Sequence, residues 1–480
     1  MLAMSEEATP LDAYARETLA RVPLADATLS LWAHVLEPDF LGQIFAEYRG
    51  RSFEDTLTFA RFVELIGDAL LTHEGSGRQS LLRAQEHGTL PTSKEAVYGK
   101  LRRVPLPLSL GFFQEGTARL RALLPPQHIA TALPASVAEF PVVVGDGKTL
   151  KRVAKRLLPA RGTAGKVYGG KLLVAFLPQE GLVVALAADP DGERNECRLV
   201  PQVVEQTRAV VVGPRLWVLD RQFCDLVQTG RCSEDGDHFL MRYHPKVHFH
   251  QDWLRPAQET QDAQGRIIRE DWGWIGSPRD ARRRAVRRLT LVRPGEETII
   301  LLTDLLDETR YPAAELLAVY LTRWGIERVF QQITEVFALR RLIGSTPQAT
   351  VFQAAFCLLL YNMVQVLRGY VAAAQPAITV AEEVSTEQVF YDVERELTTV
   401  SVLVPPAMLV GVYAEPLSPE ALRQRLHALL SPLWTPRWRK AVNTKPRPKG
   451  AKAKQSGAHT SMHRLLTAAR QSPRPQRAAA

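Results

Sequence analysis

The sequence lacks the features that mark several classes of protein. It has four cysteines in 480 residues and no C-x2-C pair, so neither a disulfide framework nor a zinc motif is predicted, and reduced thiols suit a cytosolic setting. The first residues, MLAMSEEATPLDAY, have no basic region followed by an apolar segment, so we expect no secretory signal. Polar residues interrupt the most apolar stretch, 351–367, which favours a buried helix over a membrane span. These observations favour a globular, cytosolic chain and disfavour a membrane partner.

Acidic residues are missing from the C-terminal segment. The last one is Glu420, whereas residues 436–480 hold twelve Lys and Arg. The whole chain has 60 basic and 51 acidic residues, which give a net charge of +9. Without the 12 basic residues of this segment, the rest of the chain has 48 basic and 51 acidic residues and a net charge of −3. The segment is rich in Lys, Pro, Gly and Ala and predicts a disordered tail that contacts phosphates, a solubilising extension being the alternative.

Two internal segments are also rich in basic residues. Seven cations and no acid lie between Gly147 and Gly170: Lys148, Lys151, Arg152, Lys155, Arg156, Arg161 and Lys166. The segment RDARRRAVRR adds six arginines: Arg279, Arg282, Arg283, Arg284, Arg287 and Arg288. A run of charge is usually a solvated face, so the meaning of each cluster depends on what it flanks.

Periodicity and composition divide the chain into seven expected segments. These are a flexible lead (1–25), a helical DNA-binding domain (26–135), the first part of an α/β core (136–244), a separate β-rich insertion (245–311), the second part of the core with a long helix from about Pro312 to Leu339 (312–375), a helical C-terminal region (376–435) and the disordered basic tail (436–480). A plain helical domain remains the alternative for 26–135.

The core segment predicts an α/β layer with a mixed sheet. Strands are expected at PVVVGDGKTL, KLLVAFLP and LVVALAADP, followed by a helix at 196–207, a strand at RLWVLDRQF, a short helix and a strand at HFLMRYH.

Three carboxylates stand out against this background. Asp146 and Asp220 each close an expected apolar strand, and a carboxylate at a strand end emerges at the edge of the sheet, where α/β proteins place their sites. Glu327 lies on the expected long helix, where Tyr320 and Arg323 precede it at i−7 and i−4 and fall on one stripe. By spacing alone, an ordinary surface ion pair between Arg323 and Glu327 is the favoured interpretation.

The motifs around these residues resemble those of bacterial insertion-sequence transposases. YLTRWGIERVFQQIT is similar to the Y-x2-R-x3-E-x6-K signature of the branch with a β-strand insertion before the catalytic Glu, the insertion-sequence-four family. DGKTL at Asp146 and LDRQF at Asp220 resemble the two Asp motifs of that family, and the gap of 107 positions from Asp220 to Glu327 suits an inserted domain.

The resemblance implies a ribonuclease-H-like catalytic core with a β-rich insertion and an α-helical N-terminal domain. It implies an Asp-Asp-Glu site of Asp146, Asp220 and Glu327 holding two Mg²⁺ or Mn²⁺ ions, which suit hard oxygen ligands and in-line phosphodiester chemistry. The implied substrates are double-stranded DNA of the transposon terminal inverted repeats and of the target, held by a homodimer on paired ends in the bacterial nucleoid. Tyr320 and Arg323 are expected to hold a phosphate, and Lys148, Lys151 and Arg152 to contact the DNA backbone.

One position departs from the signature. Its final Lys, which contacts DNA near the transposon end in the family, would fall at 334, where this chain has Thr334. Arg328, Arg340 or Arg341 could replace this Lys, but their helical phase differs from that of position 334. This departure leaves a second hypothesis, a catalytically impaired DNA-binding derivative of the same scaffold; a structural nucleic-acid-binding protein that uses only the tail is a third.

Overall fold

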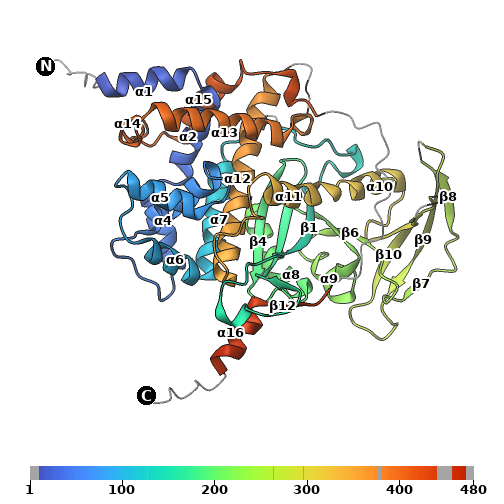
Figure 1. Cartoon of the computed structure of the whole chain (residues 1–480). Helices are drawn as coiled ribbons and strands as arrows, with labels where there is room; N and C mark the ends of the chain where they lie inside the picture. Colours follow the sequence, from blue (N-terminus) through green and yellow to red (C-terminus); the bar gives the residue numbers. More distant parts are fainter. Residues whose placement is uncertain are drawn as a thin grey trace, which may run out of the picture.

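The computed structural model describes residues 10–126, 128–262, 264–293, 295, 297–375, 378, 380–440 and 457–471. It has a mixed α/β architecture in which a helical N-terminal region and C-terminal helices pack beside one large mixed sheet (Figure 1).

Seven helices precede the sheet: α1 (Pro10–Ala20), α2 (Pro23–Val35), α3 (Pro38–Tyr48), α4 (Phe59–Leu71), α5 (Gly77–Glu86), α6 (Lys94–Arg103) and α7 (Leu106–Arg121). Prolines begin the first three, where the missing N–H costs nothing, and the side chains of Thr58, Ser76 and Ser93 cap α4, α5 and α6. The expected flexible lead over 1–25 is therefore wrong from Pro10 onward, because α1 and the start of α2 occupy it.

The first half of the sheet is built from β1 (Val142–Thr149), β3 (Lys171–Leu177), β4 (Leu182–Asp189), β5 (Leu216–Leu219) and β6 (His238–Arg242). Their order is β4-β3-β1-β5-β6, with β1 antiparallel to β3 and parallel to β5, which is parallel to β6. Between them lie α8 (Val200–Val210) and α9 (Leu226–Arg231). The predicted order of strands and helices in this segment is thus found.

Both faces of these strands are buried. Along β1 and β5, Val144 and Val218 belong to the core shared with the N-terminal helices, whereas Val143 and Trp217 belong to a second core shared with α8. Burial on two sides explains why these strands read as continuous apolar runs.

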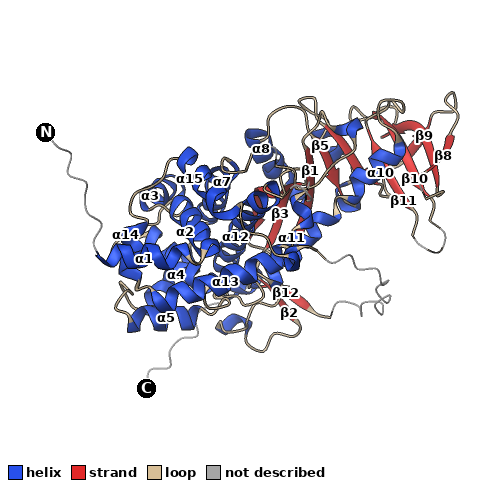
Figure 2. Cartoon of the chain, turned by 90° about the horizontal axis from the view of Figure 1, so that it is seen from above, coloured by secondary structure: helices blue, strands red, loops and turns tan. Residues whose placement is uncertain are grey.

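The inserted strands extend this sheet. They are β7 (Phe249–Gln251), β8 (Gln258–Gln261), β9 (Ile267–Ile275), β10 (Arg284–Leu291) and β11 (Ile299–Thr303). Strand β11 pairs with β6, so the sheet runs from β4 to β7 through nine strands, and β8 beside β9 is the tenth. In Figure 2 the strands β8 to β11 lie beyond β1 and β5. The expectation of a separate β insertion is corrected accordingly, since its backbone hydrogen bonds continue those of the core.

The expected long helix after Pro312 is two helices, α10 (Ala313–Leu321) and α11 (Trp324–Glu335). At the junction the N–H groups of Arg323, Gly325 and Ile326 donate to carbonyls three residues back, a tighter turn than an α-helix.

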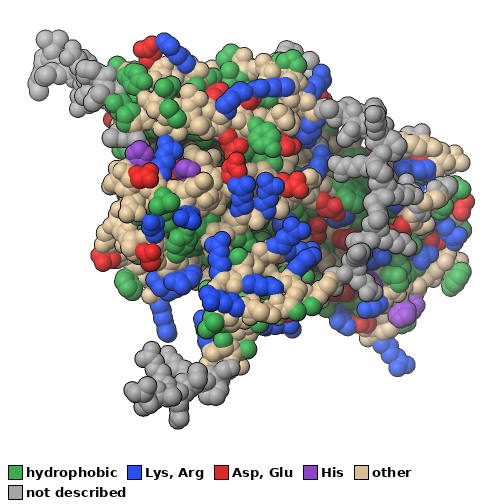
Figure 3. All heavy atoms as spheres, viewed as in Figure 1, with side chains coloured by type: hydrophobic (Ala, Val, Ile, Leu, Met, Phe, Trp, Pro, Cys, Tyr) green, Lys and Arg blue, Asp and Glu red, His purple; other side chains and the backbone are tan. Residues whose placement is uncertain are grey.

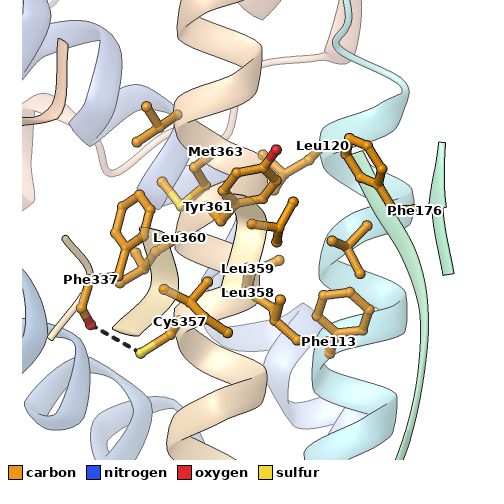
Figure 4. Packing of buried hydrophobic residues seen from close by; sticks show 14 of the residues in the cluster. Phe113, Leu120, Phe176, Phe337, Cys357, Leu358, Leu359, Leu360, Tyr361 and Met363 are labelled. Carbon is orange, nitrogen blue, oxygen red and sulfur yellow. Dashed lines mark hydrogen bonds between the residues drawn. The ribbon is translucent and has the colours of Figure 1, made fainter. Parts of the chain in front are cut away.

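Helix α12 (Pro347–Ala373) is the central packing element. It is long and apolar enough to cross a membrane, but almost all of its residues are buried, and it contacts α6, α7, α11, α13 (Thr386–Leu403) and α15 (Pro419–Leu430). Figure 4 shows its side chains interleaved with those of α7, and Cys357 Sγ donates to the carbonyl of Phe337 (3.1 Å). The sequence prediction of a buried helix is confirmed. A short helix, α14 (Pro406–Val412), lies between α13 and α15.

Part of the predicted disordered tail is ordered and docked. Strand β12 (His459–Ser461) pairs in parallel with β2 (Lys166–Tyr168), and α16 (Met462–Gln471) follows with Met462 fully buried. Arg464 binds Asp191 (2.8 Å) and Glu193 (2.7 Å). Trp438 is also buried. A buried Met and a β-pairing outweigh the polar composition here, so the prediction is wrong for 436–440 and 457–471; residues 441–456 and 472–480 lie outside the described part.

Candidate active site

Asp146 lies within a strand and not at its end. Strand β1 continues to Thr149, and Asp146 stands opposite Val174 of β3. Its carboxylate accepts a hydrogen bond from the N–H of Gly147 (2.8 Å), and its side chain is only 16% exposed. A mostly buried carboxylate with one backbone donor needs further positive charge around it.

Asp220 is the residue directly after β5, as predicted. Because β5 is parallel to β1 and adjacent to it, Asp220 emerges at the same end of the sheet as Asp146. The hydroxyl of Tyr320 donates to its carboxylate (3.4 Å). Tyr320 comes from the last turn of α10, so this contact fixes the α10–α11 junction to the sheet.

Glu327 lies in the first turn of α11, and Arg323 precedes it at the helix junction. Arg323 is 5% exposed, and its guanidinium contacts both Glu327 (Nη2–Oε1, 3.1 Å) and Asp146 (Nη1–Oδ2, 3.7 Å). The interpretation of Arg323 and Glu327 as a plain surface pair is therefore wrong. One buried arginine joins carboxylates from the sheet and from the helix.

The three predicted carboxylates thus converge on Arg323 and Tyr320. Burial disfavours the charged guanidinium of Arg323, but Tyr320 and then the charges of Asp220, Asp146 and Glu327 outweigh it, so the pKa of Arg323 is raised. The Nε–H of Arg323 is buried and has no partner among the described residues. This arginine has a donor left for a ligand, and the site is formed by three segments far apart in the sequence.

Burial dominates the electrostatics of Asp146. Burial raises its pKa to about 6; the Gly147 N–H and Arg323 act against this, while Glu196 and Asp220 add to it. Burial likewise raises the pKa of Tyr320 to about 12, so its phenol stays protonated and a donor at neutral pH. An excess of carboxylates over nearby cations is an environment that favours binding of a further cation.

The donor set suits a hard divalent cation, since it consists of carboxylate oxygens with unmet charge. Within the described residues, however, no three such groups are spaced closely enough to hold a metal ion as they stand. Arg323 lies among the carboxylates and contacts two of them, so the residues fit the cation in chemistry and share one location without forming a closed ligand set.

Of the three predicted DNA-contacting residues after Asp146, only Lys148 reaches the site. Its ammonium donates to the carbonyl of Phe330 on α11 (3.3 Å) and lies 5.2 Å from the centre of the Phe330 ring. Burial, and then the nearby charge of Lys151, lowers the pKa of Lys148 to about 8. Lys151 and Arg152 are exposed in the loop that follows β1. They flank the site and do not touch its carboxylates.

Thr334, which stands where the signature has Lys, donates its hydroxyl to the same carbonyl of Phe330 (2.6 Å). The ammonium of Lys148 and the side chain of Thr334 therefore meet at one atom. A positive charge is present beside position 334, supplied by the strand that carries Asp146.

Sequence reasoning missed Glu196. This carboxylate, on a short 3-10 turn before α8, is 12% exposed and pairs with Lys171 (3.0 Å); Gln222, two residues after Asp220, also donates to it. A Cβ added to Gly147 would lie 2.1 Å from Glu196 Oε2, so the Glu196 carboxylate packs directly against the backbone beside Asp146. Glu196 thus joins the segments that carry Asp146 and Asp220. In the sequence it reads as the ordinary first turn of a helix after Asn195, which caps it, and no local signal distinguishes it.

Comparison with known proteins places the site in a family context. Residues 140–363, a segment that contains Asp146, Asp220 and Glu327, match the family model described as the transposase DDE domain. No curated protein matches the chain. Among solved structures, a piggyBac transposase in a synaptic complex with hairpin DNA aligns over 84% of this chain and 85% of that chain, with 10% identity and a TM-score of 0.41.

Proposed function

We propose that this chain, of which residues 140–363 match the transposase DDE domain, is a DNA transposase that cleaves transposon ends and joins them to target DNA. The observation that carries the proposal is the convergence of Asp146, Asp220 and Glu327 on the buried Arg323. The buried Nε–H of Arg323 has no partner among the described residues, so a donor remains for a ligand at this point.

In this proposal Asp146, Asp220 and Glu327 hold Mg²⁺ or Mn²⁺. Such ions, when bound, polarise the scissile phosphate and lower the pKa of an attacking hydroxyl or water. The protein residues supply position and charge. Arg323 and Tyr320 have N–H and O–H donors that suit phosphate oxygens, and Arg323 can give a charged, directional contact. The low exposure of both side chains limits competition from water.

We further infer that the core is ribonuclease-H-like and that the chain belongs to the insertion-sequence-four branch. The strand order β4-β3-β1-β5-β6 with only β1, β5 and β6 parallel supports the first inference. The insertion of β7 to β11 between Asp220 and Glu327 supports the second. A homodimer on paired DNA ends completes the proposal.

The test is divalent-metal-dependent nicking and joining of DNA that carries the inverted repeats of the element encoding this chain. We expect Asp146→Ala and Glu327→Ala to lose at least a thousandfold in cleavage rate while still binding the DNA. Glu205→Ala removes an exposed carboxylate of α8 and serves as the matched control, with activity unchanged. Full activity in Asp146→Ala or Glu327→Ala would overturn the catalytic assignment.

Thr334 motivates a second candidate, a DNA-binding derivative with impaired catalysis. It predicts that the wild-type chain binds the same DNA and neither nicks nor joins it under Mg²⁺ or Mn²⁺. The position of Lys148 beside Thr334 favours the active enzyme, because the charge that the signature Lys would bring is already present.

A further inference from the structure

A cleft lies where the N-terminal helices meet the core, apart from the carboxylate site. It consists of two adjoining cavities of about 500 and 640 Å³ that share Arg78, Tyr98, Arg156 and Ile343 in their linings. One wall comes from α5 and α6, and the other from the loop after β1 and the turn after α11. Three segments distant in sequence therefore form one surface.

This cleft is strongly basic. Its linings contain seven cations, which define what we call the basic cleft: Arg78, Lys94, Arg102, Arg152, Arg156, Arg340 and Arg341. The linings contain a single carboxylate, that of Glu95. Figure 3 shows Lys and Arg side chains gathered across the lower centre of this face, between α6 and α16.

Most of these cations have no counter-charge. Arg341 pairs with Glu74 (2.6 Å), but none of the other six has a carboxylate within 4.0 Å among the described residues. Elsewhere in the chain arginines commonly have acidic partners, as Arg425 does in Asp26 (2.7 Å). Like charges held together without counter-ions repel one another, so an arrangement of this kind is stabilised by an anionic ligand.

Backbone features of the cleft point the same way. The N-terminus of α5, a helix of ten residues, opens into it through Gly75, Ser76 and Gly77, and the free N–H groups of a helix start attract anions. Arg152 adopts a left-handed conformation (φ 67°), which is unfavourable for a residue with a side chain. Such a conformation is retained most often where it serves a binding surface.

Two segments of the chain connect the cleft to the carboxylate site. Arg152 and Arg156 follow Asp146 along the chain, and Arg340 follows Glu327. The contact of Lys148 with the carbonyl of Phe330 holds the end of β1 against α11. The part of α11 from Glu327 to its last residue, Glu335, is about 12 Å long. Arg340 of the cleft lies in the turn after this helix, so this part of α11 separates the cleft from Glu327 along the chain.

We propose that the basic cleft binds the phosphate backbone of duplex DNA several base pairs from the scissile bond. The N-terminal helices and the catalytic core would then grip the same duplex. The contacts are from arginine and lysine side chains to phosphates, so they carry affinity and register and little sequence information. The proposal rests on the proposed function for the identity of the polyanion, whereas the site itself rests on the geometry and charge of the cleft.

The experiment compares two triple variants of the full chain. Arg78→Ala, Arg102→Ala and Arg156→Ala remove three exposed cations of the basic cleft. Arg16→Ala, Arg49→Ala and Arg279→Ala remove three exposed arginines outside it and keep the net charge change equal. Binding of a 12-bp and a 40-bp duplex of arbitrary sequence, labelled with fluorescein, is measured between 50 and 300 mM salt, because phosphate contacts need no cognate site.

We expect the cleft variant to bind the 40-bp duplex at least tenfold more weakly at 100 mM salt. The slope of log K against log salt should fall by about 2.7, which corresponds to three phosphate contacts. The control variant should change the affinity and the salt slope by less than a third of these amounts. For the 12-bp duplex, the difference in affinity between the two variants should be small. Equal thermal melting of the two variants and the wild type checks the fold.

Equal losses in the two variants would overturn the proposal, as would unchanged binding in the cleft variant or a preference of the wild-type cleft for single-stranded RNA over duplex DNA. The outcome is separable from that of the proposed function. If the wild type binds the long duplex through the cleft and never cleaves, only the transposase activity fails; if it cleaves and the cleft variant binds normally, only the cleft fails.

Discussion

Two arginine-rich segments of this chain, equally conspicuous in the sequence, use their charge in opposite ways. In the segment 279–288, Arg287 is fully buried and binds Glu270, while Arg288 pairs with Asp271 (2.8 Å). In the segment after β1, Arg152 and Arg156 are exposed and face a cleft without acidic partners. The first cluster holds β9 and β10 together, and the second is available to a ligand.

The lesson is that the neighbour across the sheet decides what an arginine does. Cross-strand register places Arg287 opposite Trp272 and Arg288 opposite Asp271, so acids from β9 neutralise the charge of β10. The loop after β1 has no such partner strand. Counting cations along the sequence could not separate the two cases, because both segments are runs of positive charge.

The largest expected effect comes from breaking the buried pair. Arg287→Leu leaves Glu270 as a buried carboxylate without its partner, and it also removes a donor to the carbonyl of Tyr311 (2.6 Å). We expect the free energy of unfolding to fall by about 3–5 kcal/mol, measured by urea titration. Arg156→Ala is the matched control, and we expect it to change this free energy by less than about 0.5 kcal/mol because the side chain is exposed.

Replacing both partners sharpens the same test. Arg287→Leu combined with Glu270→Leu removes the orphaned charge, so we expect it to be more stable than Arg287→Leu alone. A stability of Arg287→Leu equal to that of wild type would show that this cluster is not structural, and the contrast between the two segments would fail.

Lys148 is intermediate between the buried Arg287 and the exposed Arg156, since it is partly buried and lies beside the carboxylate site. We expect Lys148→Ala to slow cleavage of transposon-end DNA about tenfold, equivalent to about 1.4 kcal/mol of activation free energy, with a smaller change in melting temperature. The reason is the loss of the Lys148 ammonium beside the carbonyl of Phe330, to which Thr334 also donates.

Adding Thr334→Lys to Lys148→Ala returns a positive charge to the same surface from α11. Recovery of at least half of the lost rate, measured as single-turnover cleavage, is the expected result. If Thr334→Lys restores nothing while Lys148→Ala is impaired, Lys148 acts through packing against Phe330 and not through its charge.

The sequence specified the core and its carboxylates better than their surroundings. Asp220 was placed correctly because a buried apolar strand ends just before it. The strand of Asp146 ran on to Thr149, since a carboxylate held by Gly147 N–H and Arg323 can be tolerated inside a strand. The break before α11 followed from local hydrogen bonding at Arg323, which periodicity does not show.

Other features depended on contacts distant in sequence. Glu196 became part of the site only through Gly147, Lys171 and Gln222, each from a different segment. Met462 and the strand at 459–461 lie in a polar, basic segment whose average composition predicted disorder. Pairing of that strand with β2 is a tertiary event, so composition alone could not reveal it.

The smallest effect is expected from an acid near the rim of the basic cleft. Burial, and then the charge of Glu74, raises the pKa of Glu394 to about 7, and Glu74 itself pairs with Arg341 of the cleft. Because the folded state binds this proton more tightly than the unfolded chain, the contribution of Glu394 to stability is present at pH 4 and is lost as the pH rises through 7. Glu394→Gln removes this titration, so it should be the more stable protein above pH 7, by about 1 kcal/mol after allowance for partial exposure.

Urea titrations at pH 5 and pH 8 measure the difference, and Glu387→Gln on the same helix is the control. A wild-type chain whose stability relative to Glu394→Gln does not fall between these two pH values would show that solvent or a neighbouring cation already compensates this carboxylate. The uncompensated charge of this region would then be confined to the arginines.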